Sequence, residues 1–280
     1  MATSWDADNV KISKVKLTYY DGQDSESLIR GFDKGDYTVA RVFPSGSNYK
    51  SEMCIRDRIY DVIQVPLQGL TGSLYGAIGI AFFISFLWWF GVHGQSVVNG
   101  VVTALLLSNL DANKSMLAAG KLSVENGAHI VTQQFLDSFL ILSGSGITFG
   151  LVVAMLFAAK SKQYKALGKV AAFPAIFNVN EPVVFGFPIV MNPVMFLPFI
   201  IVPILAAIIV YTSIAIGFMH PFSGVTLPWS TPAIISGFMV GGWQGAFVQV
   251  LVLATSTVVY FPFFKFQDNL AYNNELQAEK

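Results

Sequence analysis

The stretch "NVNEPVVFGFP", from Asn178 to Pro188, decides how the larger part of this chain is interpreted. It lies in a very apolar region, because residues 170–264 contain one charged side chain, that of Glu181. A carboxylate costs about 2.5–3.5 kcal/mol at the centre of a membrane helix, so one that is kept there usually marks a binding site or a pathway. Pro182 follows directly, and proline interrupts the hydrogen bonds of a helix. The stretch therefore predicts a break in a membrane segment with an acidic group beside it.

Composition places the chain in a lipid bilayer. Hydrophobic residues make up 54% of the sequence and charged residues only 12%, and the mean hydropathy is +0.57. Soluble domains contain about 25% charged residues. The formal net charge of zero gives no reason to expect nucleic acid as a partner. A single cysteine, Cys54, excludes an intrachain disulfide and a CxxC motif, and His129 and His220 lack metal-ligand spacing. We expect no metal and no cofactor.

The charges divide the chain into two parts. Nine basic and nine acidic residues precede Ile59, whereas eight of each are spread over the much longer remainder. Residues 1–57 read as a soluble leader of foreign or unfamiliar origin, with strand-like alternation in "KISKVKLTYY" and "DYTVARVF". Residues 58–280 read as a membrane-embedded domain. We assign no function to the leader.

Five apolar runs are candidates for membrane segments, since a bilayer core of about 30 Å needs about 20 apolar residues per helix. Two further apolar stretches are rich in proline, "AAFPAIFNVNEPVVFGFPIVMNP" and "HPFSGVTLPWSTP". Irregular backbone at membrane depth survives only inside protein or along a watery cavity. The sequence thus predicts an all-α polytopic membrane protein with two re-entrant hairpins around a central site. The five runs are approximately 72–92, 97–110, 147–159, 196–218 and 234–264.

Basic residues predict the orientation. The segment "KSKQYKALGK", with lysines from Lys160 to Lys169, follows an apolar run directly, and short lysine-rich loops stay in the cytoplasm. The run 196–218 would then lead outward and the last run would return Lys265 to the cytoplasmic side. The more polar segment from Asp111 to Asp137 is interpreted as an excursion outside the membrane.

Two titratable side chains stand out in the apolar part. His93, in "WWFGVHGQS", lies between Gly91 and Gly94, which break a helix and allow a ligand to approach. An alternative is that His93 caps a helix at the membrane interface. Glu181, next to Asn178 and Asn180, suits the hydroxyl groups of a sugar. The alternative for Glu181 is a carboxylate neutralised by burial or bonded to a backbone amide in the bend.

The motifs "WWFGVHG", "NVNEPVVFGFP" and "HPFSGVTLPWSTPAIISG" resemble those of the enzyme IIC permeases of the phosphoenolpyruvate-dependent sugar phosphotransferase system, in the lactose, cellobiose and diacetylchitobiose family. The resemblance extends from about Ile59 to the C-terminus. It implies a multi-pass permease of the bacterial cell membrane that binds a disaccharide and moves it in an elevator-like manner. Members of this family carry further N-terminal helices that form a homodimer interface, and here the leader stands in their place.

The resemblance also implies the site and the partners. His93 and Glu181 would contact sugar hydroxyls with Asn180 beside them, and Trp229 would offer an aromatic face, although Trp229 could equally anchor at the membrane interface. The chain would have no catalytic residues of its own, because the phosphoryl group comes from cytoplasmic IIA and IIB subunits, the latter through a phosphocysteine. Cys54 lacks a phosphate-binding loop and is interpreted as inert. An ion-coupled secondary sugar transporter, which also uses a buried carboxylate and broken helices, is the alternative function.

Overall fold

The computed structural model describes residues 72–278, and this part of the chain is built of helices without strands. The predicted leader, residues 1–57, and Cys54 lie outside the described residues. The main helices are α4 (Leu74–Trp89), α5 (Gly94–Ala118), α7 (Phe149–Ala158), α8 (Lys162–Ile176), α9 (Glu181–Gly186), α10 (Pro193–Ala215) and α11 (Ile235–Ala278). The shorter elements are the 3₁₀ helix η3 (Val124–Asn126), α6 (Gln133–Phe135) and the π-helical turn η4 (Leu136–Leu140).

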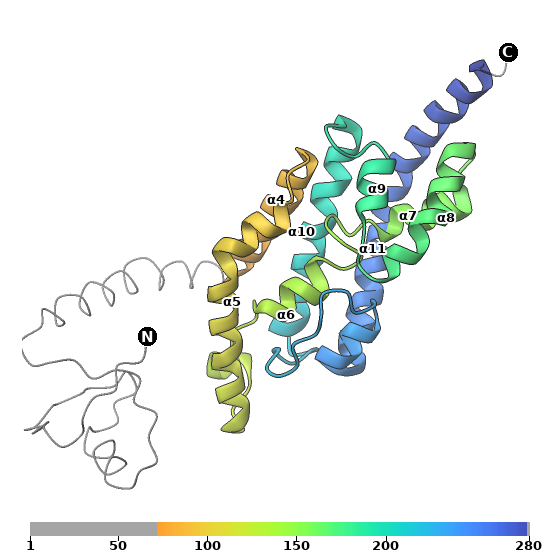
Figure 1. Ribbon diagram of the computed structural model, residues 1–280. Coiled ribbons are helices and arrows are strands. Elements are labelled where there is room, and N and C mark those ends of the chain that lie inside the picture. Colours follow the sequence, from red (N-terminus) through yellow and green to blue (C-terminus); the bar gives the residue numbers. More distant parts are fainter. Residues whose placement is uncertain (1–71, 279–280) are drawn as a thin grey trace, which may run out of the picture. The chain divides into compact units, whose positions relative to one another are not determined.

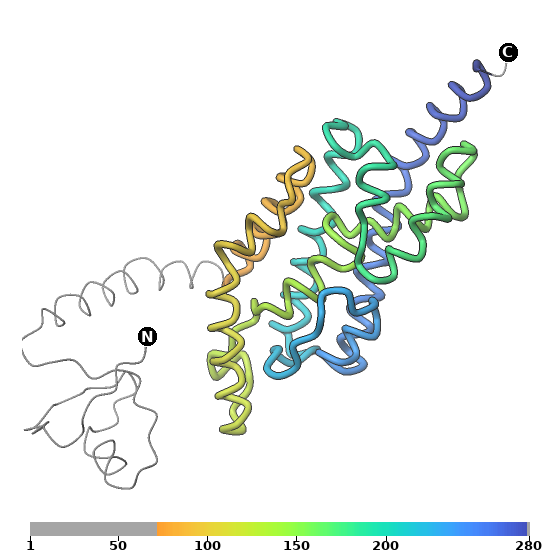
Figure 2. Tube along the Cα trace, viewed as in Figure 1, coloured from red at the N-terminus to blue at the C-terminus, as the bar shows by residue number. Residues whose placement is uncertain are grey.

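The helices pack side by side with α10 near the centre. In Figures 1 and 2, α10 lies between α4 and α11, and α7 lies against α11. Gly150 on α7 allows the close approach, because a Cβ atom there would collide with the backbone of α11 at Ser256 and Thr257. Gly150 ends the stretch "GITFG", which starts at Gly146, and glycines at this spacing are typical of close helix packing in membranes.

The predicted runs correspond to α4, α5, α7, α10 and α11. Within residues 72–278, α10 and α11 are long and apolar enough to cross a bilayer, while α4 and α7 are shorter apolar helices. At 1.5 Å per residue, α10 is about 35 Å long, enough for a full span. It contains Pro198 and Pro203 without a break. Prolines are tolerated inside membrane helices where neighbouring helices and local adjustments satisfy the freed backbone groups.

The first proline-rich stretch is broken as predicted. Helix α8 ends at Ile176, two residues after Pro174, and α9 begins at Glu181 with Pro182 in its first turn. Figure 1 shows α8 entering the bundle and α9 returning toward the end at which α8 began. We call this unit, residues 162–186, the α8–α9 hairpin.

The second proline-rich stretch differs from a helical hairpin. Residues 220–231 form an irregular loop, and the helical turn-back comes later, inside α11. There Gly241 and Gly242 leave helical geometry, Gly242 with a φ of 64°. The buried Gln249 side chain closes this bend, because its amide accepts from Gly237 N (3.0 Å) and donates to Ser138 O (2.7 Å).

The polar segment 111–137 enters the bundle earlier than the sequence predicts. Helix α5 continues to Ala118, and the chain is buried again from Ala128 onward apart from a few partly exposed positions. Residues 133–158 then form one pass through the bundle, in which α6 and η4 are separated from α7 by a buried turn. The apolar run starting at Ile147 is thus the second half of a longer, broken segment.

Two carboxylates of α11 hold the start of α8. The buried Asp268 accepts hydrogen bonds from Lys160 N (2.8 Å) and Ser161 N (3.0 Å). About two turns further along α11, Glu275 accepts from Ser161 Oγ (2.7 Å) and Lys162 N (3.0 Å). Anionic groups at a helix N-terminus satisfy its free N–H groups and its dipole. The ends of α7, α8 and α11 are therefore joined on the side that carries Lys160.

This arrangement predicts that Asp268→Ala lowers the midpoint of thermal unfolding in detergent. The substitution leaves two backbone amides without an acceptor, and each buried unpaired group costs about 1–3 kcal/mol. Asn274→Ala, at an exposed position of the same helix, is the matched control and is expected to leave the midpoint unchanged. Equal midpoints for both variants would contradict this role of Asp268.

Candidate functional site

The tip of the α8–α9 hairpin is held by the side chain of Asn178. This residue has a φ of 63°, a left-handed conformation that asparagine tolerates better than most residues. Its Oδ1 accepts from Ser143 N at 2.6 Å, and its Nδ2 donates to the carbonyl oxygens of Trp229 (2.6 Å) and Thr231 (2.9 Å). One buried amide thus joins three distant segments: the hairpin tip, the turn after η4 and the loop that carries Trp229.

The turn after η4, residues 141–148, is buried throughout. Its backbone is left-handed at Ser143, Gly144, Gly146 and Ile147, so it cannot form regular helix bonds there. Side chains satisfy its carbonyl groups instead. The predicted site residue Asn180 donates to Ser145 O (2.6 Å), and two hydroxyl groups of α11 reach the turn as well, with Tyr260 donating to Gly146 O (2.7 Å) and Ser256 to Ile147 O (2.5 Å).

Asn180 is therefore fixed in the protein by its amide nitrogen. It is 3% exposed, and Gly144 lies so close that a Cβ atom on this glycine would collide with the Asn180 side chain. The side-chain oxygen Oδ1 of Asn180 makes no hydrogen bond to the described residues. The buried turn and the hairpin tip accordingly form one unit with Glu181 at its edge.

Glu181 is the first residue of α9 and is exposed. Its carboxylate makes no hydrogen bond or ion pair to any residue in the range 72–278. The described residues therefore do not bury Glu181. A carboxylate that is free of protein partners can accept hydrogen bonds from a polar ligand.

His93 caps α5, as the alternative interpretation of this residue holds. Its Nδ1 accepts the backbone N–H of Ser96 at 3.2 Å and lies 2.8 Å from Ser96 Oγ. The imidazole is exposed and packs against Trp88, with 4.6 Å between the ring centres. Capping engages only Nδ1 of the exposed ring, so the two interpretations of His93 are compatible.

Trp88 connects His93 to the α8–α9 hairpin. The indole ring, at the end of α4, lies 6.4 Å from the ring of Phe185 on α9. Since α9 rises about 1.5 Å per residue, Phe185 is about 6 Å along the helix from Glu181. The connection is reinforced nearby, where Met191 N donates to Trp89 O (2.9 Å) and Trp89 Nε1 to Asn192 O (3.0 Å). Trp88 thereby links the start of α5 to α9.

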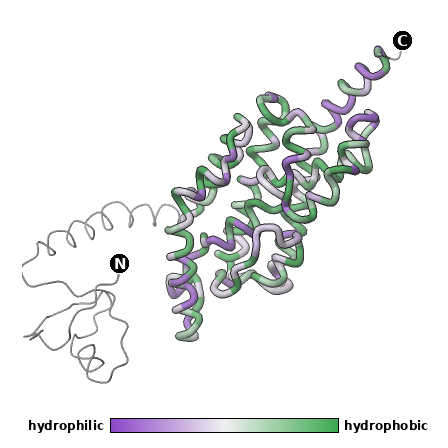
Figure 3. Tube along the Cα trace, in the orientation of Figure 1, coloured by the Kyte–Doolittle hydropathy of each residue, from purple (hydrophilic) through white to green (hydrophobic). Residues whose placement is uncertain are grey.

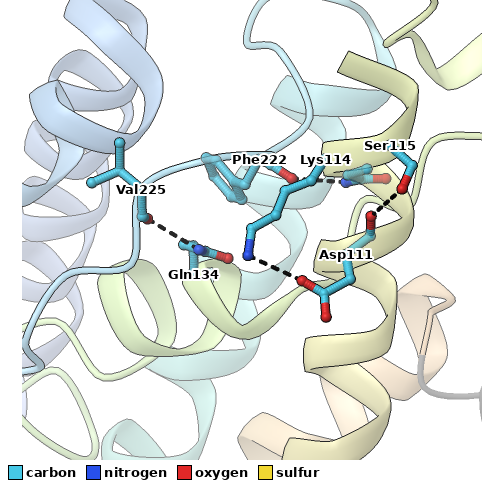
Figure 4. Close-up of polar contacts among 7 residues, drawn as sticks. Asp111, Lys114, Ser115, Gln134, Phe222 and Val225 are labelled. Atoms are coloured by element: carbon cyan, nitrogen blue, oxygen red, sulfur yellow. Dashed lines mark hydrogen bonds and ion pairs between the residues drawn. The ribbon is translucent and has the colours of Figure 1, made fainter. Parts of the chain in front are cut away.

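Trp229 lies in the irregular loop and is 55% exposed. Its backbone carbonyl is bound by Asn178, while its indole is free to contact a ligand or the membrane interface. The earlier part of the loop is hydrogen-bonded to α5 and α6. Figure 4 shows Gln134 of α6 donating to Val225 O (3.0 Å), and Asn113 of α5 likewise donates to Phe222 O (2.8 Å).

Sequence reasoning missed two features of this site. The first is the turn "LSGSGIT", whose paired glycines were a signal for left-handed backbone that periodicity of apolar residues did not reveal. The second is Trp88, which is 4% exposed and whose Nε1 has no hydrogen-bond partner among the described residues. A buried indole N–H normally finds a hydrogen-bond partner. The position of Trp88 close to His93 in the sequence was the signal that could have drawn attention to it.

Gly144→Ala is expected to destabilise the protein strongly. A left-handed alanine costs about 1–2 kcal/mol, and displacement of Asn180 removes a buried hydrogen bond worth about 1–3 kcal/mol when its partner is left unpaired. Gly100→Ala is the control, since no atom lies within 4 Å of its added Cβ and Gly100 lies inside α5. Unfolding midpoints in detergent should fall for Gly144→Ala and stay level or rise for Gly100→Ala. Two equal midpoints would show that the turn does not need this glycine.

Known proteins share both the sequence motifs and this arrangement of helices. The family model "Phosphotransferase system, EIIC" matches residues 55–203. The lichenan permease IIC component of Bacillus subtilis (strain 168) is 40% identical over 243 residues, which are 86% of this chain and 52% of that protein. The lactose-specific EIICB component of Lacticaseibacillus casei is 35% identical over 223 residues, 78% of this chain and 38% of that protein.

Among solved structures, the chain is similar to ChbC, the IIC component of the N,N'-diacetylchitobiose-specific phosphotransferase system. The TM-score is 0.74 at 37% identity, covering 79% of this chain and 51% of that one. The chain spans about half the length of the IIC relatives it matches. Both the sequence family and the arrangement of helices agree, and the chain therefore belongs to the EIIC family of the phosphotransferase system, a family of membrane transporters.

Proposed function

We propose that this chain is a permease subunit that binds and translocates a disaccharide of the cellobiose, diacetylchitobiose or lactose type. The observation that carries the proposal is the grouping of ligand-ready polar and aromatic groups around the α8–α9 hairpin. Glu181 offers a carboxylate without protein partners in the described part of the chain, His93 offers an exposed imidazole, and Trp229 offers a half-exposed indole. A pyranose ring needs both kinds of contact, hydrogen bonds for its hydroxyl groups and an aromatic surface for its C–H face.

The substrate class rests on the similar proteins. The three relatives are named for lichenan, lactose and diacetylchitobiose, and all of these are carbohydrates built of linked pyranose units. Trp229, half exposed in the loop that is hydrogen-bonded to the hairpin tip, would supply the aromatic surface for one ring of a disaccharide. We propose Asn180 as a contact through its carbonyl oxygen only, because its nitrogen is bound to Ser145.

Coupling to phosphorylation would come from a partner. The relative from Lacticaseibacillus casei is named an EIICB component, which indicates that a IIB part works together with a IIC part. We propose cytoplasmic IIB and IIA subunits for this chain, with the permease providing the sugar and IIB the phosphoryl group. We also propose a multi-pass position in the bacterial cell membrane, with the joined ends of α7, α8 and α11 on the cytoplasmic side, as the lysine-rich segment predicts.

Uptake into membrane vesicles tests this function. Vesicles that contain the protein should accumulate radiolabelled cellobiose, lactose or diacetylchitobiose when phosphoenolpyruvate, the general phosphocarrier proteins and the IIA and IIB subunits are supplied inside. Omitting phosphoenolpyruvate should abolish accumulation. Accumulation that is driven by a proton or sodium gradient alone would instead establish the ion-coupled alternative.

Glu181→Gln tests the proposed role of the carboxylate. Glutamine keeps the shape and one acceptor oxygen but replaces the other oxygen with a donor, and a hydrogen bond to a charged group contributes about 1.5–3 kcal/mol. We expect disaccharide affinity, measured by calorimetry on purified protein, to fall by at least about tenfold, with the unfolding midpoint unchanged. Glu125→Gln, at an exposed position distant in sequence, is the control for loss of one negative charge. Normal affinity with a lowered midpoint would show that Glu181 has a structural role instead.

A further inference from the structure

Helix α8 presents two different faces. Tyr164, Gly168, Ala171 and Ala175 are buried against the bundle, at the spacing of one helix face. The opposite face is exposed and changes character along its length. Its first half carries Lys162, Lys165 and Lys169, and its second half carries Phe173 and Ile176.

These five exposed residues lie on one stripe of the helix. They follow one another at intervals of three or four, so their side chains point in nearly the same direction at 100° per residue. Lys162 and Lys169 are about 10 Å apart along the axis, and Ile176 lies about 10 Å further on. Phe173 is 71% exposed, and the neighbouring Val170 is 68% exposed. Basic and apolar side chains thus meet at a sharp boundary after Lys169.

Lys165 and Lys169 are not neutralised by the nearby carboxylates. Asp268 binds the backbone amides of Lys160 and Ser161, and Glu275 likewise bonds to Ser161 and backbone amides beside it. Lys165 and Lys169 form no ion pair within residues 72–278. Residues 159–170 contain four lysines and no acidic residue. Figure 3 shows the resulting hydrophilic patch at the start of α8, next to hydrophobic chain.

We propose that this stripe, the basic stripe of α8, binds the headgroups of anionic phospholipids at the cytoplasmic surface. Acyl chains would cover Val170, Phe173 and Ile176, while phosphate oxygens would contact Lys165 and Lys169. A lipid matches both halves of the stripe at once, because its charged and apolar parts follow in the same order. A soluble protein partner would match the lysines but would leave the apolar half to be covered by something else.

Such binding would also affect the position of the candidate site relative to the membrane. The basic stripe belongs to the same hairpin that carries Asn178, Asn180 and Glu181 at its tip. Headgroups bound to Lys165 and Lys169 fix the depth of α8 relative to the membrane surface. Lipid binding is a property beyond transport and requires only that the chain lies in a bilayer.

The test is a titration of the purified protein in neutral detergent with phosphatidylglycerol or phosphatidylcholine, read out by the unfolding midpoint and by lipid retained in native mass spectrometry. Phosphatidylglycerol should stabilise the wild-type protein and stay bound, and phosphatidylcholine should do neither. One lysine near an anionic lipid surface contributes a factor of about five in affinity. The double substitution Lys165→Gln/Lys169→Gln should therefore weaken phosphatidylglycerol binding about 25-fold.

Two matched variants control for charge and folding. Lys165→Arg/Lys169→Arg should retain the lipid response, because the positive charges remain. Lys114→Gln/Lys121→Gln removes the same charge from exposed positions at the end of α5 and should also retain it. The proposal is overturned if the two lipids act alike on the wild-type protein, or if the glutamine variant at 165 and 169 keeps its phosphatidylglycerol affinity.

Binding of phosphorylated IIB and calorimetry with cellobiose, on the same samples, distinguish a lipid site from a protein-binding surface and from the sugar site. Loss of phospho-IIB binding in Lys165→Gln/Lys169→Gln with unchanged lipid affinity would assign the stripe to the protein partner and overturn the lipid site. A protein that responds to phosphatidylglycerol through these lysines but binds no disaccharide would support the lipid site and contradict the proposed function.

Discussion

Backbone groups that leave helical geometry inside a bilayer must find partners within the protein, since no water is available to them. In this chain the constraint is concentrated at the buried turn 141–148. Four side chains from two other segments meet it, the amides of Asn178 and Asn180 and the hydroxyl groups of Ser256 and Tyr260. The packing of α11 on α7 and the position of the hairpin tip both follow from satisfying this one turn. The candidate site exists where it does because the same asparagines that serve the turn stand next to Glu181.

The sequence predicted the helical class, the five apolar segments and the break at Pro182, because each depends on local composition or on a residue that cannot continue a helix. It also singled out His93 and Glu181, since titratable groups in apolar surroundings are unusual, whereas Trp229 was proposed from the resemblance to the IIC permeases. The buried turn was not predicted, because its polar groups are satisfied by residues more than thirty positions away, and such pairings leave no local pattern. The hydrogen bond from the Asn180 amide nitrogen to Ser145 O depends on the same long-range contacts.

The charged groups near α8 show how one segment can serve two environments. The carboxylates of Asp268 and Glu275 are directed at the helix end, where free N–H groups need acceptors, and the ammonium groups of Lys165 and Lys169 remain on the outside. The carboxylates of α11 and these two lysines of α8 thus have different roles and do not pair with each other. If the carboxylates paired with these lysines instead, the helix end would lose its acceptors and the outer face its charge.

Asn178 also constrains how the protein can move. A single amide bonds to Ser143, Trp229 and Thr231, each at 2.6–2.9 Å. Sliding the hairpin past either neighbour would break hydrogen bonds in a medium that offers no replacement. The hairpin tip, the buried turn and the Trp229 loop would consequently move together as one rigid body. Any change of conformation would then have to occur in the segments that connect this body to the rest of the chain.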